Sequence, residues 1–315
     1  MVKVSVCIPT YNRSHLLTCA IASVLEQDYH DFEIIVCDDG SKDDTPERMA
    51  EWSDARIRYI RHEQNIGKSN NMISGYKAAQ GEYFIKFDDD DRLTPQFLSQ
   101  TVAILDQHSD IDFVGTDHWV INSENQREVT LSDANSERWG RTTLPAGPIQ
   151  DLLTRVFVQQ SLQIGATLFR KSVLDEISYM RPNLQNCEDN DLLVRLALAG
   201  KQAYYLPDRL MEYRFHDEQQ GIGRAIPYLK DKIQYLNLYK FSEPALETIR
   251  CDRLRETQLL LGLRLVEIGE TQQGKDLLRQ GEAHSKLKAR AGQFIALFPR
   301  SLRPSLFGLL RRMKN

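Results

Sequence analysis

Short apolar runs alternate with amphipathic segments through the first third of the chain. The runs are rich in β-branched and aromatic residues, which predicts strands. The predicted strands cover residues 2–10, 32–38, 57–62 and 82–87. The segments between them carry apolar residues at helical spacing, and these predicted helices cover residues 14–27, 43–52, 68–80 and 95–108. Strands that alternate with helices of this length indicate βαβ units, so we expect an α/β domain with a mainly parallel sheet and helices on both faces.

The pattern is less regular between residues 111 and 216. Apolar residues here predict further strands and one helix, and a polar stretch between them predicts a loop. In chain order we expect a strand at 111–122, a loop at 123–148, a strand and turn at 163–174, a helix at 186–200 and short strands at 201–207 and 210–216. The helix at 186–200 has acidic residues in its first turn and Gly200 at its end.

The last third of the chain is predicted to be helical throughout. The change in pattern places a boundary near residue 220, with one domain at 1–220 and a helical region at 221–315. Residues 262–281 read as two helices joined by a short turn. Residues 286–315 contain eight Lys or Arg, no Asp or Glu, and interleaved Leu and Phe. Such a basic amphipathic tail fits an anionic membrane surface; the alternative is a helix packed on the main domain with a solvated basic face.

Composition narrows the class of protein. Apolar residues make up 41% and charged residues 27% of the 315 residues, which is typical of a globular chain. The net charge of −4 gives no signal for nucleic-acid binding. Five cysteines without CxxC spacing favour a reduced, cytosolic protein. We expect no signal peptide, because the chain leads directly into a strand, and no membrane span, because no run reaches about 18 apolar residues.

Polar clusters follow three of the predicted strands. They lie at residues 9–13 (PTYNR), 38–41 (DDGS) and 88–92 (DDDDR). In parallel sheets ligands bind beyond the carboxyl ends of the strands, so we expect the three clusters to meet at one crevice. Their convergence is the first indication of function.

The four consecutive aspartates raise the question of what compensates their charge. On extended backbone, Asp88 and Asp90 would face the crevice and Asp89 the other way. Carboxylates are suitable ligands for Mg²⁺ or Mn²⁺, which commonly bind through one or two of them together with phosphate oxygens. The alternative is a solvated acidic turn before the helix at 95. For Asp39 we weigh a hydrogen bond to a nucleobase or ribose against an Asx turn that precedes the next helix.

Taken together, five ordered stretches resemble the family 2 inverting glycosyltransferases, which have the Rossmann-like A-type fold. The stretches are VSVCIPTYNR (4–13), EIIVCDDGSKDDT (33–45), NIG (65–67), AAQGEYFIKFDDDD (78–91) and CEDNDLLVRLA (187–197). Each is weak alone, but the set is specific. The resemblance covers about residues 2–217 and leaves out the helical C-terminal third.

The resemblance implies a role for each site residue. Tyr11 would face the base of a nucleotide-sugar, Asp39 would contact that base, and Asp88 would approach the ribose. The full donor-binding set that it implies is Thr10, Tyr11, Arg13, Asp39, Lys68, Asp88 and Asp89. It implies that Asp90 and His216 bind the metal, that Asp189 is the general base, and that Glu188 is its catalytic partner. The alternatives are first-turn acids that compensate the helix dipole, and a structural His216.

The chain departs from the family at one point of the donor site. Family members often carry an Arg-Asn pair where this chain has Met72 and Ile73, and Lys68, Asn70 or Asn71 would have to replace those contacts. The QxxRW motif and the membrane spans of processive synthases are missing, so we expect addition of a single sugar.

The expected function is therefore transfer, with Mn²⁺ or Mg²⁺, from a UDP- or dTDP-sugar to a hydroxyl of a glycan or glycolipid. We expect a role in bacterial cell-surface synthesis, in the cytoplasm or on the inner face of the plasma membrane. Two alternatives are a sugar-phosphate nucleotidyltransferase, disfavoured because PTYNR contains no Gly, and a non-catalytic nucleotide-binding scaffold, disfavoured because all the candidate acids are present.

Overall fold

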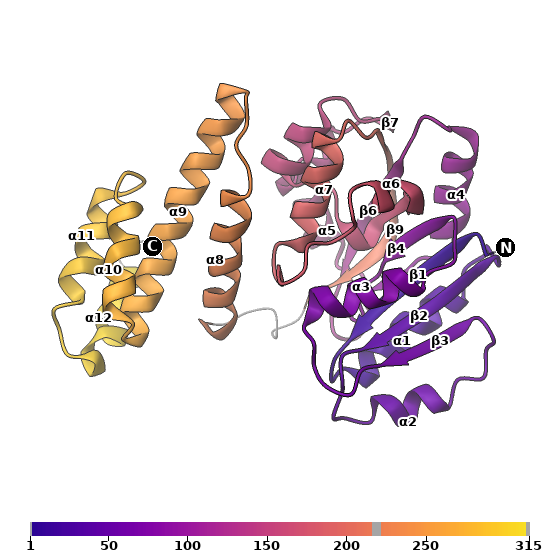
Figure 1. Ribbon diagram of the computed structural model, residues 1–315, viewed down its shortest axis with the longest axis horizontal. Helices are drawn as coiled ribbons and strands as arrows, with labels where there is room; N and C mark the ends of the chain where they lie inside the picture. The colour runs from indigo at the N-terminus through magenta and orange to yellow at the C-terminus, as the bar shows by residue number, and fades with distance from the viewer. Residues whose placement is uncertain (1, 216–221, 313–315) are drawn as a thin grey trace. The chain divides into compact units, whose positions relative to one another are not determined.

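The structure, a computed structural model, describes residues 2–215 and 222–312. The chain divides into two compact units, Met1–His216 and Asp217–Asn315. Figure 1 shows a sheet with surrounding helices in the first unit and only helices in the second. The two units are described separately below.

The first unit is built on one mixed sheet. Its strands are β1 (Val4–Thr10), β2 (Phe32–Asp38), β3 (Ile57–Arg61), β4 (Tyr83–Lys86), β5 (Arg92–Leu93), β6 (Phe113–Ile121), β7 (Gly147–Pro148), β8 (Thr167–Arg170) and β9 (Ala203–Arg214). Their order is β3-β2-β1-β4-β8-β6-β9-β5, with β7 paired to β9. The first four strands are parallel, β8 is antiparallel to both neighbours, and β6 and β9 are again parallel. The predicted, mainly parallel sheet is confirmed.

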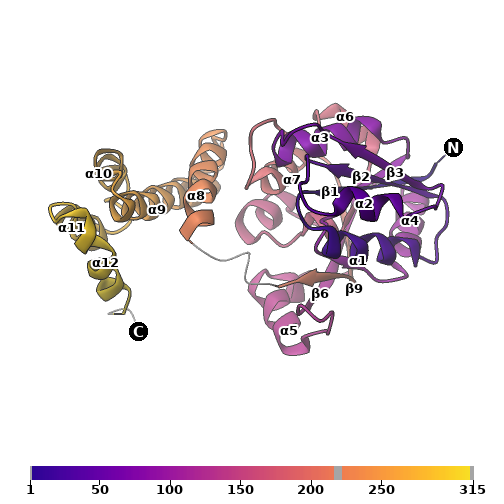
Figure 2. The same cartoon turned by 90° about the horizontal axis from the view of Figure 1, so that it is seen from below.

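Helices cover both faces of this sheet, as predicted. They are α1 (Ser14–Leu25), α2 (Thr45–Ala50), α3 (Lys68–Ala78), α4 (Phe97–Gln107), α5 (Val129–Arg138), α6 (Lys171–Glu176) and α7 (Glu188–Leu198). Figure 2 shows α1 and α3 on opposite sides of β1 and β2. The first four helices lie within two residues of the predicted starts, because each predicted pattern had apolar residues at helical spacing.

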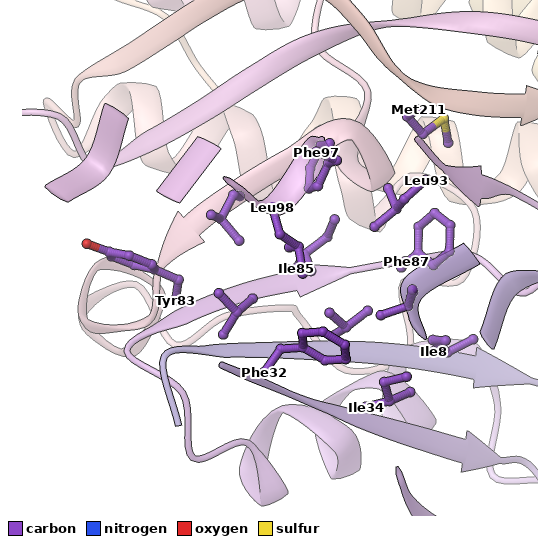
Figure 3. Close-up of a cluster of buried hydrophobic side chains, with 14 of the residues drawn as sticks. Ile8, Phe32, Ile34, Tyr83, Ile85, Phe87, Leu93, Phe97, Leu98 and Met211 are labelled. Atoms are coloured by element: carbon purple, nitrogen blue, oxygen red, sulfur yellow. The ribbon is translucent and has the colours of Figure 1, made fainter. Parts of the chain in front are cut away.

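Alternation along the strands decides what each face buries. Ile8, Ile34, Ile85 and Phe87 belong to one apolar core, together with residues of α1 and α4 (Figure 3). The residues between them point to the face covered by α3, where Gly75 lies over two thiols. A Cβ at Gly75 would come within 2.4 Å of one sulfur and 2.5 Å of the other, so only glycine lets α3 approach this closely. This packing sets the start of α3 beside the carboxyl ends of β1 and β2.

Two expectations for the middle of the chain were wrong. The predicted loop at 123–148 contains α5, whose Ser132 accepts a hydrogen bond from the backbone N–H of Val120 at 2.8 Å. Periodicity did not reveal this helix because buried polar groups hold it to β6. The two predicted short strands are one continuous β9. Pro207 and Asp208 lie where the register with β6 shifts, so the sheet accommodates the proline at a bulge.

The second unit consists of α8 (Ile222–Asn237), α9 (Pro244–Ile268), α10 (Thr271–Gln280), α11 (Lys286–Ile295) and α12 (Arg303–Arg312). The predicted helical region and the helix pair at 262–281 are confirmed. Helix α9 ends at Gly269, whose φ of +100° is a left-handed conformation that glycine adopts without strain. The buried Arg303 donates to the backbone carbonyls of Val266, Ala296 and Phe298. Within the described ranges, no helix is both long and apolar enough to cross a bilayer.

A buried polar cluster joins β6 to the segment around α5. Asp117 accepts hydrogen bonds from Ser136 at 2.6 Å and from Arg141 at 2.6 Å. The neighbouring His118 is 3% exposed, with its Nε2 3.1 Å from Asn135 Oδ1. Burial, assisted by the Arg141 charge and despite the Asp117 carboxylate, lowers the pKa of His118 to about 4. The imidazole is therefore neutral in the folded protein near neutral pH.

This predicts acid sensitivity. The unfolded chain binds a proton at His118 near pH 6.5, whereas the folded chain does so only near pH 4, so stability is lost as the pH falls through this window. We expect the free energy of unfolding to fall by roughly 2–3 kcal/mol from this residue. Urea titrations of the parent and of His118→Gln between pH 7 and 4 check this, with the exposed His108→Gln as control. Equal pH slopes for the parent and His118→Gln would contradict the prediction.

Candidate active site

The carboxyl ends of β1, β2 and β4 open on a pocket of about 450 Å³. Its lining residues are Pro9, Thr10, Tyr11, Arg13, Asp39, Asn65, Gly67, Lys68, Asn71, Asp88, Asp89 and Gln185. All seven residues of the predicted donor-binding set are among them, so the predicted convergence of three strand ends occurs. Binding of a donor by these residues stays a prediction. Gln185, which no motif indicated, reaches the pocket because its Oε1 accepts from the backbone of Ser69 at the start of α3.

The acidic segment turns sharply after Asp88 rather than continuing as a strand. Residues 89 and 90 form a turn, and Arg13 contacts both of their carboxylates, at 3.2 Å for Asp89 and 2.8 Å for Asp90. Asp89 also accepts a hydrogen bond from Thr10 at 2.7 Å. The side chains after Phe87 were expected to alternate between the two faces of an extended strand, and this is wrong, because Asp89 faces the pocket beside Asp88. The Arg13 guanidinium can bind the two carboxylates at once only when residues 89 and 90 form a turn, so it favours the turn over the extended form.

Arg13 is thus the first of two basic residues that compensate the negative charge of the four aspartates. Burial and the neighbouring Asp90 charge raise the pKa of Asp89 to about 7, although Arg13 and Thr10 act in the opposite direction. Asp89 therefore holds a proton more readily than an isolated aspartate would.

The second compensation is Lys86, a residue that the motifs did not indicate. Lys86 ends β4 and is 1% exposed, and its Nζ lies 2.8 Å from Asp88 and 3.3 Å from Asp189. Strand alternation turns its side chain to the face opposite the Ile85 and Phe87 core. The sequence feature that could have indicated Lys86 is a lysine at the end of an apolar strand, because a buried ammonium requires acidic partners.

Lys86 and Lys68 together determine the ionisation of Asp88. Burial would raise the pKa of Asp88, but the two lysine charges outweigh it and hold this pKa at about 2. The pKa of each lysine is in turn raised by the surrounding carboxylates, although desolvation opposes the shift. Asp88 is therefore a carboxylate at any physiological pH.

The acids at the start of α7 have different partners. Glu188 is buried and its Oε1 lies 2.7 Å from Lys68, while Asp189 contacts Lys86 through Oδ2. Oδ1 of Asp189 is buried and has no hydrogen-bond partner among the described residues. Asp191 is fully buried and accepts from Arg195 at 2.7 Å, which is a structural role. Burial raises the pKa of Glu188, with Lys68 opposing the shift.

Asp39 shapes the opposite wall of the pocket. Its two carboxylate oxygens accept from the backbone N–H groups of Ile66 at 2.7 Å and Gly67 at 3.1 Å. Burial raises its pKa, although these two hydrogen bonds oppose the shift. Gly40 has a φ of +76°, and a Cβ there would lie 2.8 Å from the backbone of Gln64. The DDGS cluster therefore holds the NIG loop in place as well as facing the pocket.

The departure from the family pattern leaves Lys68 and Asn71 at the pocket. Met72 is completely buried in the core, whereas the Asn70 side chain donates to the carbonyl of Ile66 within the same loop. Asn71 is 2% exposed and donates to the carbonyl of Cys37 at 2.7 Å. Its Oδ1 has no hydrogen-bond partner among the described residues. Asn71 therefore presents an unused acceptor at the lining of the pocket.

Asp90, the candidate ligand for a divalent cation that the structure describes, does not line the pocket as expected, but shares Arg13 with the pocket-lining Asp89. Asp90 is a hard oxygen donor whose side chain is 13% exposed. Residues 2–215 and 222–312 contain no cluster of three or more His, Cys, Asp or Glu side chains arranged around a metal. One carboxylate nevertheless fits Mg²⁺ or Mn²⁺, since these ions take their other ligands from phosphate and water. His216, the second predicted ligand, lies outside the described residues.

Asp91 belongs to the framework rather than to the pocket. Its Oδ1 accepts from the backbone N–H of Arg214 at the end of β9 at 2.9 Å, and the Arg214 side chain donates to the carbonyl of Asp90 at 2.7 Å. Burial raises the pKa of Asp91. These contacts hold the acidic turn against β9.

A π-helix forms the other side of the α7 start. It spans Thr154–Gln159 and ends at Gln160, which has a left-handed conformation with a φ of 54°. The Gln160 side chain donates to Asn190 at 3.3 Å, one residue after Asp189. π-helices and strained residues are frequent at functional sites.

Comparison with known proteins adds to this geometry. The profile of the family described as Glycosyl transferase family 2 matches residues 5–177. The chain is 32% identical over 120 residues to the UDP-Glc:alpha-D-GlcNAc-diphosphoundecaprenol beta-1,3-glucosyltransferase WfgD of Escherichia coli, covering 38% of this chain and 47% of that protein. It is 29% identical over 247 residues to the GalNAc(5)-diNAcBac-PP-undecaprenol beta-1,3-glucosyltransferase of Campylobacter jejuni, covering 77% of this chain and 75% of that protein. The chain thus spans about half the length of the first relative.

Solved structures show the same fold. S. aureus TarS 1-349 in complex with UDP-GlcNAc superposes with a TM-score of 0.64 at 19% identity, over 96% of this chain and 91% of that chain. The mannosyltransferase PcManGT from Pyrobaculum calidifontis, in complex with GDP-Man and Mn²⁺, gives a TM-score of 0.59 at 17% identity, over 97% and 85%. At these identities the likeness shows the fold alone, and the predicted A-type fold class is confirmed.

The buried charge pairs predict the effect of removing Lys86. Lys86→Met leaves Asp88 and Asp189 without their shared cation, so we expect the free energy of unfolding to fall by about 2–4 kcal/mol. Urea unfolding at pH 7 measures this. Lys77→Met, on the exposed side of α3, is the matched control and should change stability by less than about 0.5 kcal/mol. A Lys86→Met protein as stable as the parent would show that the pairs contribute no net stability.

Proposed function

Because the chain belongs to glycosyl transferase family 2, an inverting family, we propose that it transfers a single sugar from a nucleoside diphosphate sugar to a hydroxyl acceptor. One observation supports this most directly: Asp189 shares Lys86 with the pocket-lining Asp88, and it keeps a buried carboxylate oxygen that no group among the described residues hydrogen-bonds. An unsatisfied buried acceptor costs free energy. A substrate hydroxyl would satisfy it by donating its proton.

The donor would occupy the pocket at the strand ends. Tyr11 is 43% exposed at the rim and offers a ring on which a base can stack. Asp39 and the unused Oδ1 of Asn71 are acceptors for base or ribose N–H and O–H groups. Lys68 and Arg13 supply positive charge for the diphosphate. These groups suit a UDP- or dTDP-sugar, which is the donor class we propose.

Mn²⁺ or Mg²⁺ would be held by Asp90, and by His216 as the resemblance implies. When bound, such a cation stabilises the negative charge that develops on the leaving diphosphate. The mannosyltransferase PcManGT was solved with Mn²⁺, and this supports the proposal without extending to residue contacts.

The reaction itself would depend on the start of α7. An acceptor hydroxyl has a high pKa, so a carboxylate must take its proton as the oxygen attacks the anomeric carbon. Asp189 is the proposed base, and attack opposite the leaving group inverts that carbon. Glu188, paired with Lys68, orients the lysine toward the pocket and has a supporting role. Gln160 and Asn190 would contact the acceptor next to Asp189.

The acceptor that we propose is a glycan or lipid-linked sugar of bacterial cell-surface synthesis. The names of both curated relatives specify undecaprenol-linked acceptors. The corresponding location is the cytoplasm, with contact to the inner face of the plasma membrane through residues 286–315. In this scheme residues 1–220 form the catalytic domain and 221–315 the helical region. The nucleotidyltransferase and scaffold alternatives receive no support from the family match.

Activity tests the proposed base. We expect Asp189→Asn to lower kcat by at least 100-fold, because general base catalysis contributes about 10²–10⁴. Its donor affinity should change by less than about threefold, since the amide keeps the shape of the carboxylate. Release of nucleoside diphosphate from UDP- and dTDP-sugars with Mn²⁺ measures the rate. The exposed Asp110→Asn is the control, and near-parental turnover by Asp189→Asn would remove Asp189 from this role.

Ligand binding tests the cation site without requiring turnover. A nucleotide-sugar that binds the native state raises the thermal midpoint. We expect this rise to require Mn²⁺ or Mg²⁺, and to be lost with EDTA and in Asp90→Ala. Asp28→Ala, outside the pocket, should retain the rise. A metal-independent rise of equal size in Asp90→Ala would contradict the assignment of Asp90.

A further inference from the structure

Helix α11 of the C-terminal unit carries apolar residues on its inward face and, beside basic ones, on its outward face. Its inward face consists of small residues and one isoleucine, while its outward face carries the larger leucine and phenylalanine side chains. A surface helix of a globular protein normally has the reverse arrangement, with large apolar residues inside and polar residues outside. The arrangement therefore needs an explanation beyond folding.

The orientation of α11 is set by close packing. Ala289 is fully buried, and Gly292 lies so close to the neighbouring helices that a Cβ would come within 2.6 Å of Leu263 and 2.9 Å of Leu278. A leucine or phenylalanine does not fit in this contact. Rotating α11 to bury its larger side chains would therefore push the helices of the unit apart, so those side chains must point outward.

The outward residues form one stripe. Leu287 is 82% exposed, Phe294 is 61% exposed and Leu297 is 71% exposed. Leu287 and Phe294 are seven residues apart on α11, which places them on one side of the helix, and Leu297 lies in the turn directly after the helix ends at Ile295. We call these three residues the α11 stripe. Exposure of this much of three large apolar side chains within eleven residues is typical of an interaction surface.

Charge indicates which kind of partner fits the stripe. Lys286 and Arg290 lie on the same side of the helix, and the Arg290 side chain is 74% exposed even though its Nε lies 3.7 Å from a Glu282 carboxylate oxygen. Residues 286–315 contain no Asp or Glu, although the whole chain has a net charge of −4. An apolar stripe flanked by basic residues complements an anionic, apolar layer. The headgroup region of a bilayer with anionic lipids is such a layer.

We propose that the α11 stripe inserts into the interface of an anionic membrane, with Lys286 and Arg290 contacting lipid phosphates. The packing that holds the small-residue face inward presents the stripe in a ready-formed helix, so little ordering is needed on binding. The proposal concerns the C-terminal unit and does not depend on the chemistry of the pocket.

Vesicle sedimentation with the full chain tests the proposal. The parent should bind vesicles of phosphatidylglycerol mixed with phosphatidylcholine. It should bind much less to vesicles of phosphatidylcholine alone, and high salt should weaken its binding to the mixed vesicles. The triple variant Leu287→Ser, Phe294→Ser, Leu297→Ser should lose at least tenfold in partitioning. The variant Lys286→Gln, Arg290→Gln should lose about fivefold for each charge and show a weaker salt dependence.

A matched triple variant separates the stripe from general surface apolarity. Val129→Ser, Leu131→Ser and Leu260→Ser remove three other exposed apolar side chains and should leave vesicle binding unchanged. Equal loss in both triples, or vesicle binding by the α11 triple equal to that of the parent, would overturn the proposal. A concentration-dependent dimer in sedimentation velocity that only the α11 triple abolishes would also overturn it, because a second copy would then cover the stripe.

Vesicle binding is measured without donor or cation, so its failure would remove the membrane contact proposed for residues 286–315 and leave the proposed sugar transfer untouched. Conversely, the α11 triple should release nucleoside diphosphate from a sugar donor at the parental rate, because no stripe residue lines the pocket. A parallel loss of this activity and of helix content by circular dichroism would show that the stripe supports folding, and would overturn the proposal.

Discussion

The candidate site depends on the pairing of strand-end carboxylates with basic side chains. Arg13 joins Asp89 and Asp90, and Lys86 joins Asp88 to Asp189. Without these pairs, acids from β4 and α7 would repel one another at the point where the sheet brings them together. The pairs also connect three separate segments of the chain, so the geometry of the site and the stability of the fold rest on the same contacts.

Much of this architecture follows from patterns that the sequence displays. The strands and helices up to residue 108, the convergence of three polar clusters and the C-terminal helices all arise from periodicity and from strand-to-helix order. What periodicity does not encode is which polar groups satisfy one another. Ser132 and Asp117 hold the 123–148 segment in place through buried hydrogen bonds, and a polar composition alone reads as a loop.

The same limit applies inside the site. Strand alternation correctly places Ile85 and Phe87 in the core. It fails at Asp89, because the backbone there forms a turn that lets Arg13 bind two carboxylates. Lys86 belongs to no motif, because a single cation within an apolar strand reveals its acidic partners only once the chain has folded. The role of Gln160 depends on a π-helix and on a contact with α7, and neither has a local sequence signature.

The bridging position of Arg13 has a thermodynamic consequence. In this structure the carboxylates of the turn already have a partner, so a positive ion that approaches them must compete with Arg13. An anionic ligand that pairs with Arg13 would remove this competition, and a cation that binds the carboxylates would free the guanidinium for an anion. By linkage, the anion would change the free energy of cation binding by as much as the cation changes that of anion binding. If both ions bind at these residues as proposed, their binding would be mutually reinforcing, and the complex of the two would bind more tightly than either ion alone.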